Sequence, residues 1–191
     1  MQKPDNFLTE EELRNYGFKR VGRNVKISRK ASVYTPELIE LGDNVRIDDF
    51  CAISGRIVFG NFVHITVFCL LAGGPEGIFF GDFTTLAYRC TVFTRSDDYT
   101  GLTLANSTVP EKYRFETISL PVYIKKHAIV GANSVVFPGA HIEEGVSIGA
   151  CSLVTKATEP WGIYFGVPAE RKRERSKNLL VQEKELLAEW Q

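Results

Sequence analysis

The most regular pattern in the chain is an aliphatic or phenylalanine residue at every sixth position. One run comprises Leu41, Ile47, Ile53, Phe59, Ile65 and Leu71, and a second comprises Ile124, Val130, Val136, Ile142, Ile148 and Val154. A period of six fits neither an α-helix nor a β-hairpin. It is explained if three hexapeptides form the three sides of a triangular coil, and each coil buries its aliphatic side chains against the coils above and below. The pattern therefore predicts an all-β fold, a parallel β-solenoid.

The phase of this repeat can be followed through most of the chain. An earlier run comprises Val21, Ile27, Val33 and Ile39; a two-residue slip leads to Leu41, and a bulge at Gly73, Gly74, Pro75 and Gly77 resets the phase to Phe80, Leu86 and Val92. A glycine directly follows several of the inward residues, at Gly22, Gly42, Gly60, Gly81, Gly131 and Gly149, where its conformational freedom suits a tight corner. Ordinary short strands joined by glycine turns are the alternative interpretation.

Both ends of the chain and one internal segment depart from the repeat. Residues 1–20 contain the capping-box sequence Thr9-Glu10-Glu11-Glu12 and predict a short helix that covers the N-terminal end of a solenoid spanning residues 21–168. Residues 169–191 predict a C-terminal helix that caps the other end or packs on a neighbouring subunit, with Leu179, Leu180, Leu186, Leu187 and Trp190 on one face. A projecting loop at about residues 95–121 interrupts the coil, and long loops in regular folds often carry function.

Composition limits the classes of function. At 191 residues the chain is expected to form one domain, and its 23 Lys and Arg balance 23 Asp and Glu, so no overall field attracts nucleic acid or an anionic membrane. The N-terminus lacks the apolar region of a signal peptide, and no apolar run is long enough to span a bilayer. We expect a cytoplasmic protein.

The four cysteines show neither CxxC pairs nor zinc-finger spacing. Cys51, Cys69 and Cys90 each follow an inward residue by four positions, so they share one phase of the coil, and Cys151 is the fourth. We interpret them as packing residues and predict no metal site.

The solenoid pattern, together with particular sequences near the C-terminus, resembles the left-handed β-helix hexapeptide acyltransferases. The sequences are Gly131-Ala132-Asn133-Ser134, Pro138-Gly139, Ile148-Gly149-Ala150, Ser152-Leu153-Val154-Thr155-Lys156 and Gly166-Val167-Pro168-Ala169. Within that superfamily the chain is most similar to the galactoside, maltose and sugar O- or N-acetyltransferases, especially those that serve surface polysaccharides. The resemblance implies a homotrimer, acetyl-CoA as donor, and active sites in the grooves between subunits, each partly covered by a projecting loop.

The resemblance also suggests which residues bind the donor. The backbones of Gly131, Ala132, Gly149 and Ala150 would contact the pantetheine arm, followed by Thr155 and Lys156. Arg171 and Arg173 would meet the CoA phosphates, because guanidinium groups match phosphate geometry; a solvated surface is the alternative for both.

Acyl transfer needs a group that removes a proton from the acceptor. His64 precedes inward Ile65 and points outward, on the face that carries an active-site asparagine in the galactoside-type enzymes, so it is our first candidate. His141 and His127 are alternatives, as is the absence of any histidine base. The related enzymes place their base histidine in the loop, where this chain has Asp97. We therefore expect Asp97 to orient His64, and Asp98 to hold the loop through Asx-type turns.

The acceptor is expected to be an amine on a nucleotide-linked sugar in polysaccharide biosynthesis, with direct transfer and no covalent enzyme intermediate. An unprotonated amine needs less help from a base than a hydroxyl does, and this loop lacks the family's histidine. Tyr88, Arg89, Arg95 and Tyr99 are candidate contacts for the nucleotide. The alternatives are O-acetylation of a sugar hydroxyl, a γ-type carbonic anhydrase, which would need three converging histidines, and a non-catalytic solenoid.

Overall fold

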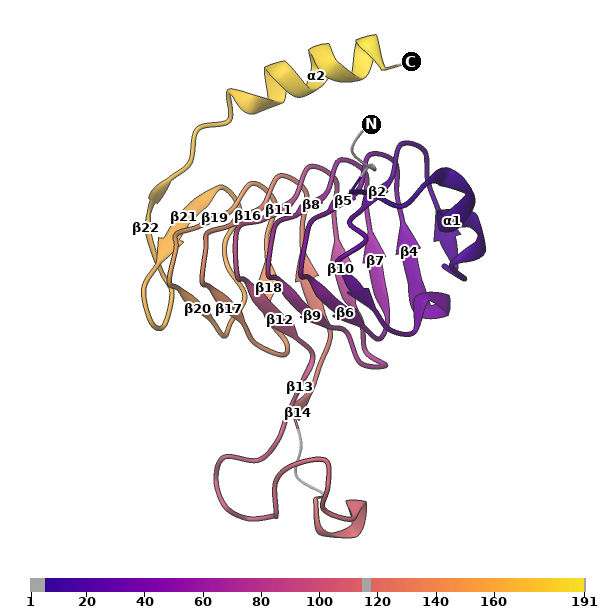
Figure 1. Cartoon of the computed structure of the whole chain (residues 1–191). Helices are drawn as coiled ribbons and strands as arrows, with labels where there is room; N and C mark the ends of the chain where they lie inside the picture. The colour runs from indigo at the N-terminus through magenta and orange to yellow at the C-terminus, as the bar shows by residue number, and fades with distance from the viewer. Residues whose placement is uncertain (1–5, 115–117, 191) are drawn as a thin grey trace.

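A computed structural model describes residues 6–114 and 118–190, which form a parallel β-solenoid with two helices (Figure 1). Three sheets form its sides. Sheet 1 comprises β1 (Arg20–Val21), β4 (Ile39–Leu41), β7 (Ile57–Phe59), β10 (Ile78–Phe80), β15 (Val122–Ile124) and β18 (His141–Ile142). Sheet 2 comprises β2 (Lys26–Ile27), β5 (Arg46–Ile47), β8 (His64–Ile65), β11 (Thr85–Leu86), β16 (Ile129–Val130), β19 (Ser147–Ile148), β21 (Gly162–Phe165) and β22 (Glu170–Glu174). Sheet 3 comprises β3 (Ser32–Val33), β6 (Ala52–Ser54), β9 (Leu70–Ala72), β12 (Thr91–Phe93), β17 (Val135–Val136) and β20 (Leu153–Val154).

The core is the column of side chains that the six-residue period predicts. Ile47, Ile65, Leu86 and Val130 follow one another in the parallel register of sheet 2, and each is at most 1% exposed. The two runs that define the period are buried throughout, from Leu41 to Leu71 and from Ile124 to Val154. Because aliphatic side chains stack directly on their counterparts one coil away, the period-six prediction of a parallel solenoid is confirmed.

Departures from the repeat all occur at one corner, where the chain passes from sheet 3 to sheet 1. The first is the 3-10 helix η1 (Pro36–Leu38), the second is the bulge around Gly73 and Gly74, and the third is the long loop. The loop leaves the body through the antiparallel pair β13 (Arg95–Ser96) and β14 (Ile118–Ser119) and contains the 3-10 helix η2 (Glu111–Tyr113). Gly74 lies at the base of the loop, with a positive φ of 50°, where a Cβ would lie 2.8 Å from the Thr94 Oγ1.

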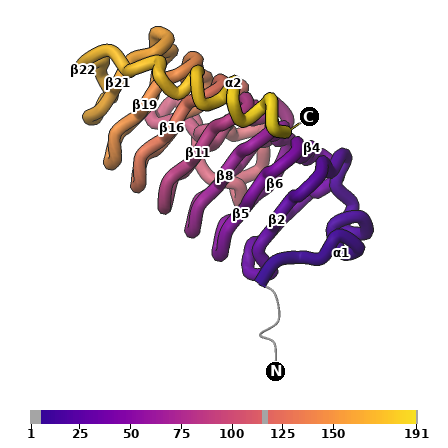
Figure 2. The backbone as a smooth tube through the Cα atoms, turned by 90° about the horizontal axis from the view of Figure 1, so that it is seen from above, coloured from indigo at the N-terminus to yellow at the C-terminus, as the bar shows by residue number. Residues whose placement is uncertain are grey.

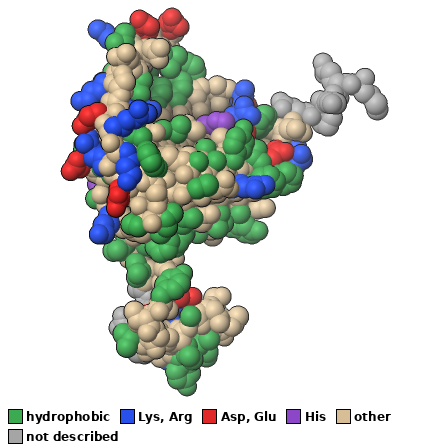
Figure 3. Space-filling view, turned by 90° about the vertical axis from the view of Figure 1, so that its left-hand side faces the viewer, with side chains coloured by type: hydrophobic (Ala, Val, Ile, Leu, Met, Phe, Trp, Pro, Cys, Tyr) green, Lys and Arg blue, Asp and Glu red, His purple; other side chains and the backbone are tan. Residues whose placement is uncertain are grey.

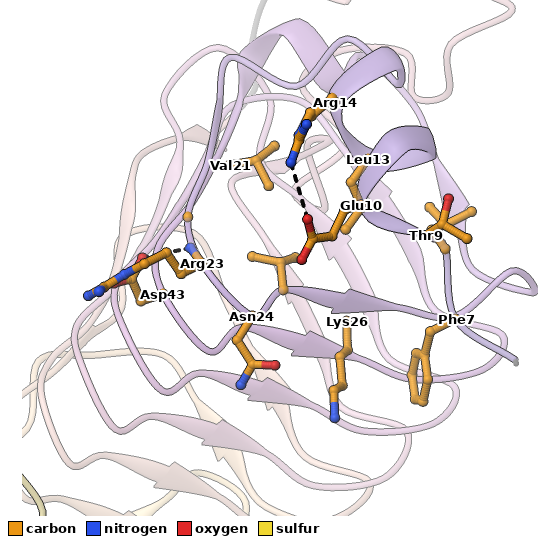
Figure 4. Close-up of a pocket in the computed structure, with 13 residues that line it drawn as sticks. Phe7, Thr9, Glu10, Leu13, Arg14, Val21, Arg23, Asn24, Lys26 and Asp43 are labelled. Carbon is orange, nitrogen blue, oxygen red and sulfur yellow. Dashed lines mark hydrogen bonds and ion pairs between the residues drawn. The ribbon is translucent and has the colours of Figure 1, made fainter. Parts of the chain in front are cut away.

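The N-terminal helix α1 (Glu10–Asn15) is present with the predicted capping box. The Thr9 Oγ1 accepts the Glu12 N–H, the Glu12 carboxylate accepts the Thr9 N–H, and Leu13 is 3% exposed against the core. Beneath α1 is a cavity of about 890 Å³, where the Glu10–Arg14 and Arg23–Asp43 pairs lie (Figure 4). α1 therefore covers the end of the stack without filling it.

The C-terminal segment differs from the prediction. Residues 170–174 form strand β22, antiparallel to β21, and the helix α2 starts only at Leu179 and ends at Glu189. The exposed edge of β21 offers backbone hydrogen bonds that a helix starting at Ala169 could not make. α2 does not cap the C-terminal end; it runs back along the stack toward the N-terminal coils (Figures 1 and 2).

α2 follows the corner between sheets 1 and 2, where aromatic rings stack from coil to coil. Phe62 stacks on Phe83 at 4.8 Å and Phe83 on His127 at 5.2 Å, and Trp190 of α2 meets Phe62 edge-on at 5.3 Å. Within the described residues, no helix is long and apolar enough to cross a membrane.

The cysteines pack as expected. The thiols of Cys51, Cys69 and Cys90 lie in one column and donate to the carbonyl oxygens of Thr66 (3.0 Å), Ala87 (3.2 Å) and Gly131 (3.2 Å) respectively. Ser134 and Ser152 continue the column in later coils, buried in the same way. This position of the coil is therefore occupied by small side chains that donate a hydrogen bond to a backbone carbonyl oxygen, a thiol in Cys and a hydroxyl in Ser.

Candidate active site

His64 lies on the outer face of sheet 2 with a half-exposed ring. Strand β8 buries Ile65 in the core, so the preceding residue must point outward. The His64 Nε2 lies 2.8 Å from the Asp48 Oδ2, and the His64 side chain is 38% exposed. The ring is thus both held by a carboxylate and accessible from solvent.

Asp48 follows the inward residue Ile47 of the preceding coil, and its side chain is only 12% exposed. Its Oδ1 accepts a hydrogen bond of 2.7 Å from the Arg46 Nε. Arg46 and His64 are register partners in adjacent strands, so β5 and β8 bring an arginine, an aspartate and a histidine into one line.

The loop carboxylates have other partners. The Asp98 Oδ1 accepts both the N–H and the hydroxyl of Thr100, and its Oδ2 accepts the Thr103 N–H. The Thr100 hydroxyl and backbone hydrogen bonds lower the pKa of Asp98 to about 2. The predicted structural role of Asp98 is therefore confirmed. The Asp97 Oδ2 accepts the Asn106 N–H at 3.0 Å.

The predicted pairing of Asp97 with His64 is not formed within the chain. The loop projects from the corner between sheets 3 and 1, away from α2, whereas His64 lies on sheet 2 and already binds Asp48 (Figure 1). Within one chain, the carboxylate that binds His64 therefore comes from the preceding coil and not from the loop.

The glycines and alanines predicted to bind the donor do lie together. Gly131 and Ala132 in one coil lie next to Gly149 and Ala150 in the following coil, since the Cys151 N–H donates to the Ala132 oxygen. The amides of Gly131 and Gly149 donate to the oxygens of Ile148 and Tyr164, at 2.8 and 2.7 Å. A Cβ on Gly131 would lie 2.4 Å from the Ala150 nitrogen, so close packing of the coils explains this glycine. The N–H groups of these two glycines therefore already serve the solenoid.

The remaining predicted donor residues lie near the C-terminal end. Thr155 and Lys156 line a small cavity of about 230 Å³ after β20. Arg171 on β22 pairs with Glu174 at 2.6 Å and with Glu159 at 3.5 Å, while Arg173 is exposed on the same strand. Arg171 is thus already paired with carboxylates.

The four residues predicted to contact the nucleotide fall into two groups. Tyr88 is 60% exposed at the corner between sheets 2 and 3, next to Arg89, whose guanidinium lies 5.6 Å from the centre of the Phe68 ring. Arg95 and Tyr99 belong to the loop. Arg95 contributes to a polar cavity of about 370 Å³ within the loop, lined also by Ser96, Asp97, Ser107, Glu111 and Arg114.

The three histidines do not converge. The His127 Nε2 binds the Glu183 Oε2 of α2 at 2.9 Å, and the His141 Nε2 lies 3.2 Å from the Glu143 Oε1 on sheet 1. Across residues 6–114 and 118–190, no group of three His, Cys, Asp or Glu side chains could hold a metal ion. The arrangement required by a γ-type carbonic anhydrase is not formed by these histidines.

Sequence reasoning missed Asp48 and Arg46. The sequence does contain a signal for Asp48. Coils in this region repeat every 18 residues, so Ile47 lies directly below Ile65. The residue that follows Ile47 therefore lies diagonally below the residue that precedes Ile65. Asp48 and His64 satisfy that spacing.

Comparisons with known proteins agree with this fold. No model of a protein family matches the chain. The chain is 39% identical to the dTDP-4-amino-4,6-dideoxy-D-glucose acyltransferase of Escherichia coli over 177 residues, which cover 91% of each protein. A hexapeptide-repeat acetyltransferase structure from Vibrio cholerae, 18% identical with a TM-score of 0.57, covers 92% of this chain and 84% of that one and shows likeness of fold alone.

Crystal structures of AntD, an N-acyltransferase from Bacillus cereus, are more similar. The complex of AntD with dTDP and 3-hydroxybutyryl-CoA is 41% identical to this chain, with a TM-score of 0.94, and covers 97% of this chain and 98% of AntD. A serine-to-alanine variant of AntD with dTDP-4-amino-4,6-dideoxyglucose and coenzyme A is 42% identical, with a TM-score of 0.94, and covers 96% and 98%.

Proposed function

The chain belongs to the dTDP-amino-sugar acyltransferases, enzymes with a hexapeptide β-solenoid, and we propose that it transfers an acyl group from a CoA thioester to the 4-amino group of a dTDP-linked 4-amino-4,6-dideoxy sugar. The observation that carries this proposal is identity of about 40% along nearly the whole chain to an enzyme crystallised with both such ligands. The sequence-based choice of a nucleotide-linked amine over a hydroxyl acceptor agrees with these relatives.

We infer acetyl-CoA as the donor and surface polysaccharide as the destination of the product, in the cytoplasm where CoA thioesters and nucleotide sugars occur together. The donor inference rests on the family resemblance of the sequence. 3-Hydroxybutyryl-CoA, which AntD binds, is the second candidate donor.

The active unit is proposed to be a homotrimer. The projecting loop is separate from the body and carries exposed apolar side chains (Figure 3), with Tyr99 84%, Leu102 75% and Leu104 58% exposed. Apolar side chains on an extended arm favour contact with another surface, and a neighbouring copy supplies one. In this assembly the loop of one subunit brings Asp97 to the site of the next.

His64 is proposed as the base, and Asp97 from the neighbouring loop is proposed as a further carboxylate that stabilises the protonated imidazole. The amine nitrogen attacks the thioester carbon, the imidazole takes the proton released from nitrogen, and the C–S bond breaks as that proton passes to the CoA sulfur. The products are the amide and free CoA thiol, with no covalent enzyme intermediate. Tyr88, Arg89, Arg95 and Tyr99 are proposed contacts of the nucleotide. The proposed contacts of the donor are the backbones of Gly131, Ala132, Gly149 and Ala150 and the side chains of Thr155, Lys156, Arg171 and Arg173.

The test incubates the purified protein with acetyl-CoA or 3-hydroxybutyryl-CoA and with dTDP-4-amino-4,6-dideoxyglucose. We expect a product whose mass increases by one acyl group and which resists hydroxylamine, because it is an amide. dTDP-glucose, which offers only hydroxyl groups, is the matched control. A hydroxylamine-sensitive ester on the control, with no reaction of the amino sugar, would reverse the proposal.

A further inference from the structure

Asp48 joins the two basic side chains of the site on sheet 2. Its carboxylate accepts from the Arg46 Nε at 2.7 Å and lies 2.8 Å from the His64 Nε2. An arginine stays protonated in proteins and can only donate, so Asp48 is held as an anion that can only accept. The Nε2 of His64 must therefore carry the hydrogen of this contact.

This requirement fixes the neutral tautomer of His64. A neutral imidazole has one N–H, and with that hydrogen on Nε2 the lone pair lies on Nδ1. The His64 side chain is 38% exposed and its Nε2 faces Asp48, so the side of the ring that is not bonded to Asp48 is open to a ligand.

We propose that Asp48 is a positioning residue for acyl transfer, which holds His64 as the Nε2–H tautomer with Nδ1 as the proton acceptor. The proposal rests on the function proposed above and on His64 as its base. When Nδ1 takes the proton of the acceptor nitrogen, both ring nitrogens carry hydrogen, and the Asp48 carboxylate then lies next to a cation that it stabilises. The proton leaves Nδ1 for the CoA sulfur, and the starting tautomer is restored.

Other charged groups around the ring support this arrangement. The register partner of His64 on β11 is Thr85, which is neutral. Its register partner on β5 is Arg46, and the partner of Arg46 on β2 is Lys26. Arg46 is bonded to Asp48, so its charge holds the carboxylate in place. Within the described residues, Asp48 is the carboxylate bonded to this ring.

The other two histidines lack this combination. His127 also binds a buried carboxylate, but its ring is only 6% exposed beneath α2, so substrate cannot reach it. His141 is accessible, but its contact with Glu143 is longer, at 3.2 Å, and that carboxylate is 31% exposed. The His141–Glu143 pair therefore provides a matched control on a different face.

The kinetic experiment compares three variants of the full chain. Asp48→Asn keeps the shape, but its amide nitrogen can donate to Nε2 and move the ring hydrogen to Nδ1. We expect kcat to fall about a hundredfold, with KM for both substrates within about twofold of wild type. Asp48→Glu keeps the carboxylate, so its kcat should be at least about tenfold higher than that of Asp48→Asn. Glu143→Gln should leave kcat unchanged.

The second measurement reads the tautomer directly. The chain has three histidines, so nitrogen-15 histidine labelling gives few signals, and His64→Gln assigns those of His64. We expect Nε2–H in wild type and in Asp48→Glu, and Nδ1–H in Asp48→Asn. An Nδ1–H tautomer in wild type, or a His64→Gln variant with full kcat, would overturn the proposal.

The two proposals fail in different ways. If wild type acylates no dTDP-linked amino sugar, the proposed function fails whatever the tautomer of His64. If wild type acylates the amino sugar but Asp48→Asn is as fast, the function stands and the positioning role of Asp48 is wrong. Circular dichroism of each variant separates a loss of kcat from a loss of folding.

Discussion

The Glu183 Oε2 of α2 lies 2.9 Å from the Nε2 of His127, a residue 56 positions earlier at the corner between sheets 1 and 2. Glu183 also pairs with Lys126, and the Arg175 Nη1 donates to the His127 oxygen at 2.7 Å. α2 has no buried residue, whereas the side chain of Glu183 is 10% exposed and that of His127 6%. Polar contacts at one position therefore hold α2 on the solenoid more than apolar burial does.

Replacing Glu183 should loosen α2 while the solenoid stays folded. Glu183→Ala leaves His127 and Lys126 without their carboxylate, so we expect hydrogen exchange of the α2 amides to increase at least about tenfold. The measurement is exchange followed by mass spectrometry. Glu185→Ala, on the same helix and exposed, is the control and should change exchange little. Equal exchange in both variants would show that the apolar contacts suffice.

Acid should release α2 through the same residue. Burial alone would raise the pKa of Glu183, but the hydrogen bonds from Lys126 and His127 hold it below its ordinary value of 4.5. Because the folded-state pKa is lowered, this carboxylate stabilises docking above pH 4.5, and the contribution is lost as pH falls below that value. The readout is fluorescence of Trp190, which packs on Phe62, in a Trp161→Phe background. The step should be absent when Glu183→Ala is added.

The core column should be sensitive to loss of volume. Ile142 is 0% exposed, and Ile142→Ala should reduce the free energy of unfolding by about 2–5 kcal/mol, from lost burial and the cavity left behind. Ile129, two strands earlier in the chain, is 37% exposed on the outer face, and Ile129→Ala should cost less than about 1 kcal/mol. Urea unfolding of the two variants checks the difference. Equal losses would contradict the assignment of the inward phase.

Thiol reactivity should separate one cysteine from three. Cys51, Cys69 and Cys90 are buried and Cys151 is exposed. Burial keeps a reagent away from the first three thiols, whereas the Cys151 thiol is open to it. A chromogenic disulfide reagent should titrate one thiol per chain in native protein and four after unfolding. Cys151→Ser should remove the native reaction; fast reaction of more than one thiol would show that the column opens.

Much of the fold could be predicted from sequence because each coil repeats the same local rule. The buried positions from Leu41 to Leu71 and from Ile124 to Val154 follow from period six alone, and the capping box at Thr9 and Glu12 gave the first helix. Strand β22 could not be predicted, because Glu170–Glu174 reads as a charged helix start, and its conformation depends on the exposed edge of β21.

The site was less predictable than the fold. His64 was found because its position beside Ile65 fixes the direction of its side chain, but its partner depends on which residue of the preceding coil lies diagonally below. The glycines were ambiguous for a different reason. Gly131 and Gly149 suit both a cofactor site and close packing of the coils. Their N–H groups are already hydrogen-bonded to the next coil, which agrees with packing. The sequence also does not predict whether Tyr88 and Tyr99 contribute to one site. Tyr88 lies at the corner between sheets 2 and 3, and Tyr99 lies in the loop between sheets 3 and 1.

The restriction of irregular segments to one corner has a consequence for how such a chain can change its length. Successive core residues along sheet 2 are separated by 20, 18, 21, 44 and 18 residues, for Ile27, Ile47, Ile65, Leu86, Val130 and Ile148 in turn. Every excess over 18 enters between sheets 3 and 1, and the register on either side is unchanged. Insertions at that corner therefore alter the outline of the molecule without altering its core, so this edge is where new segments can be added during evolution or by engineering while the other two edges keep their fixed spacing.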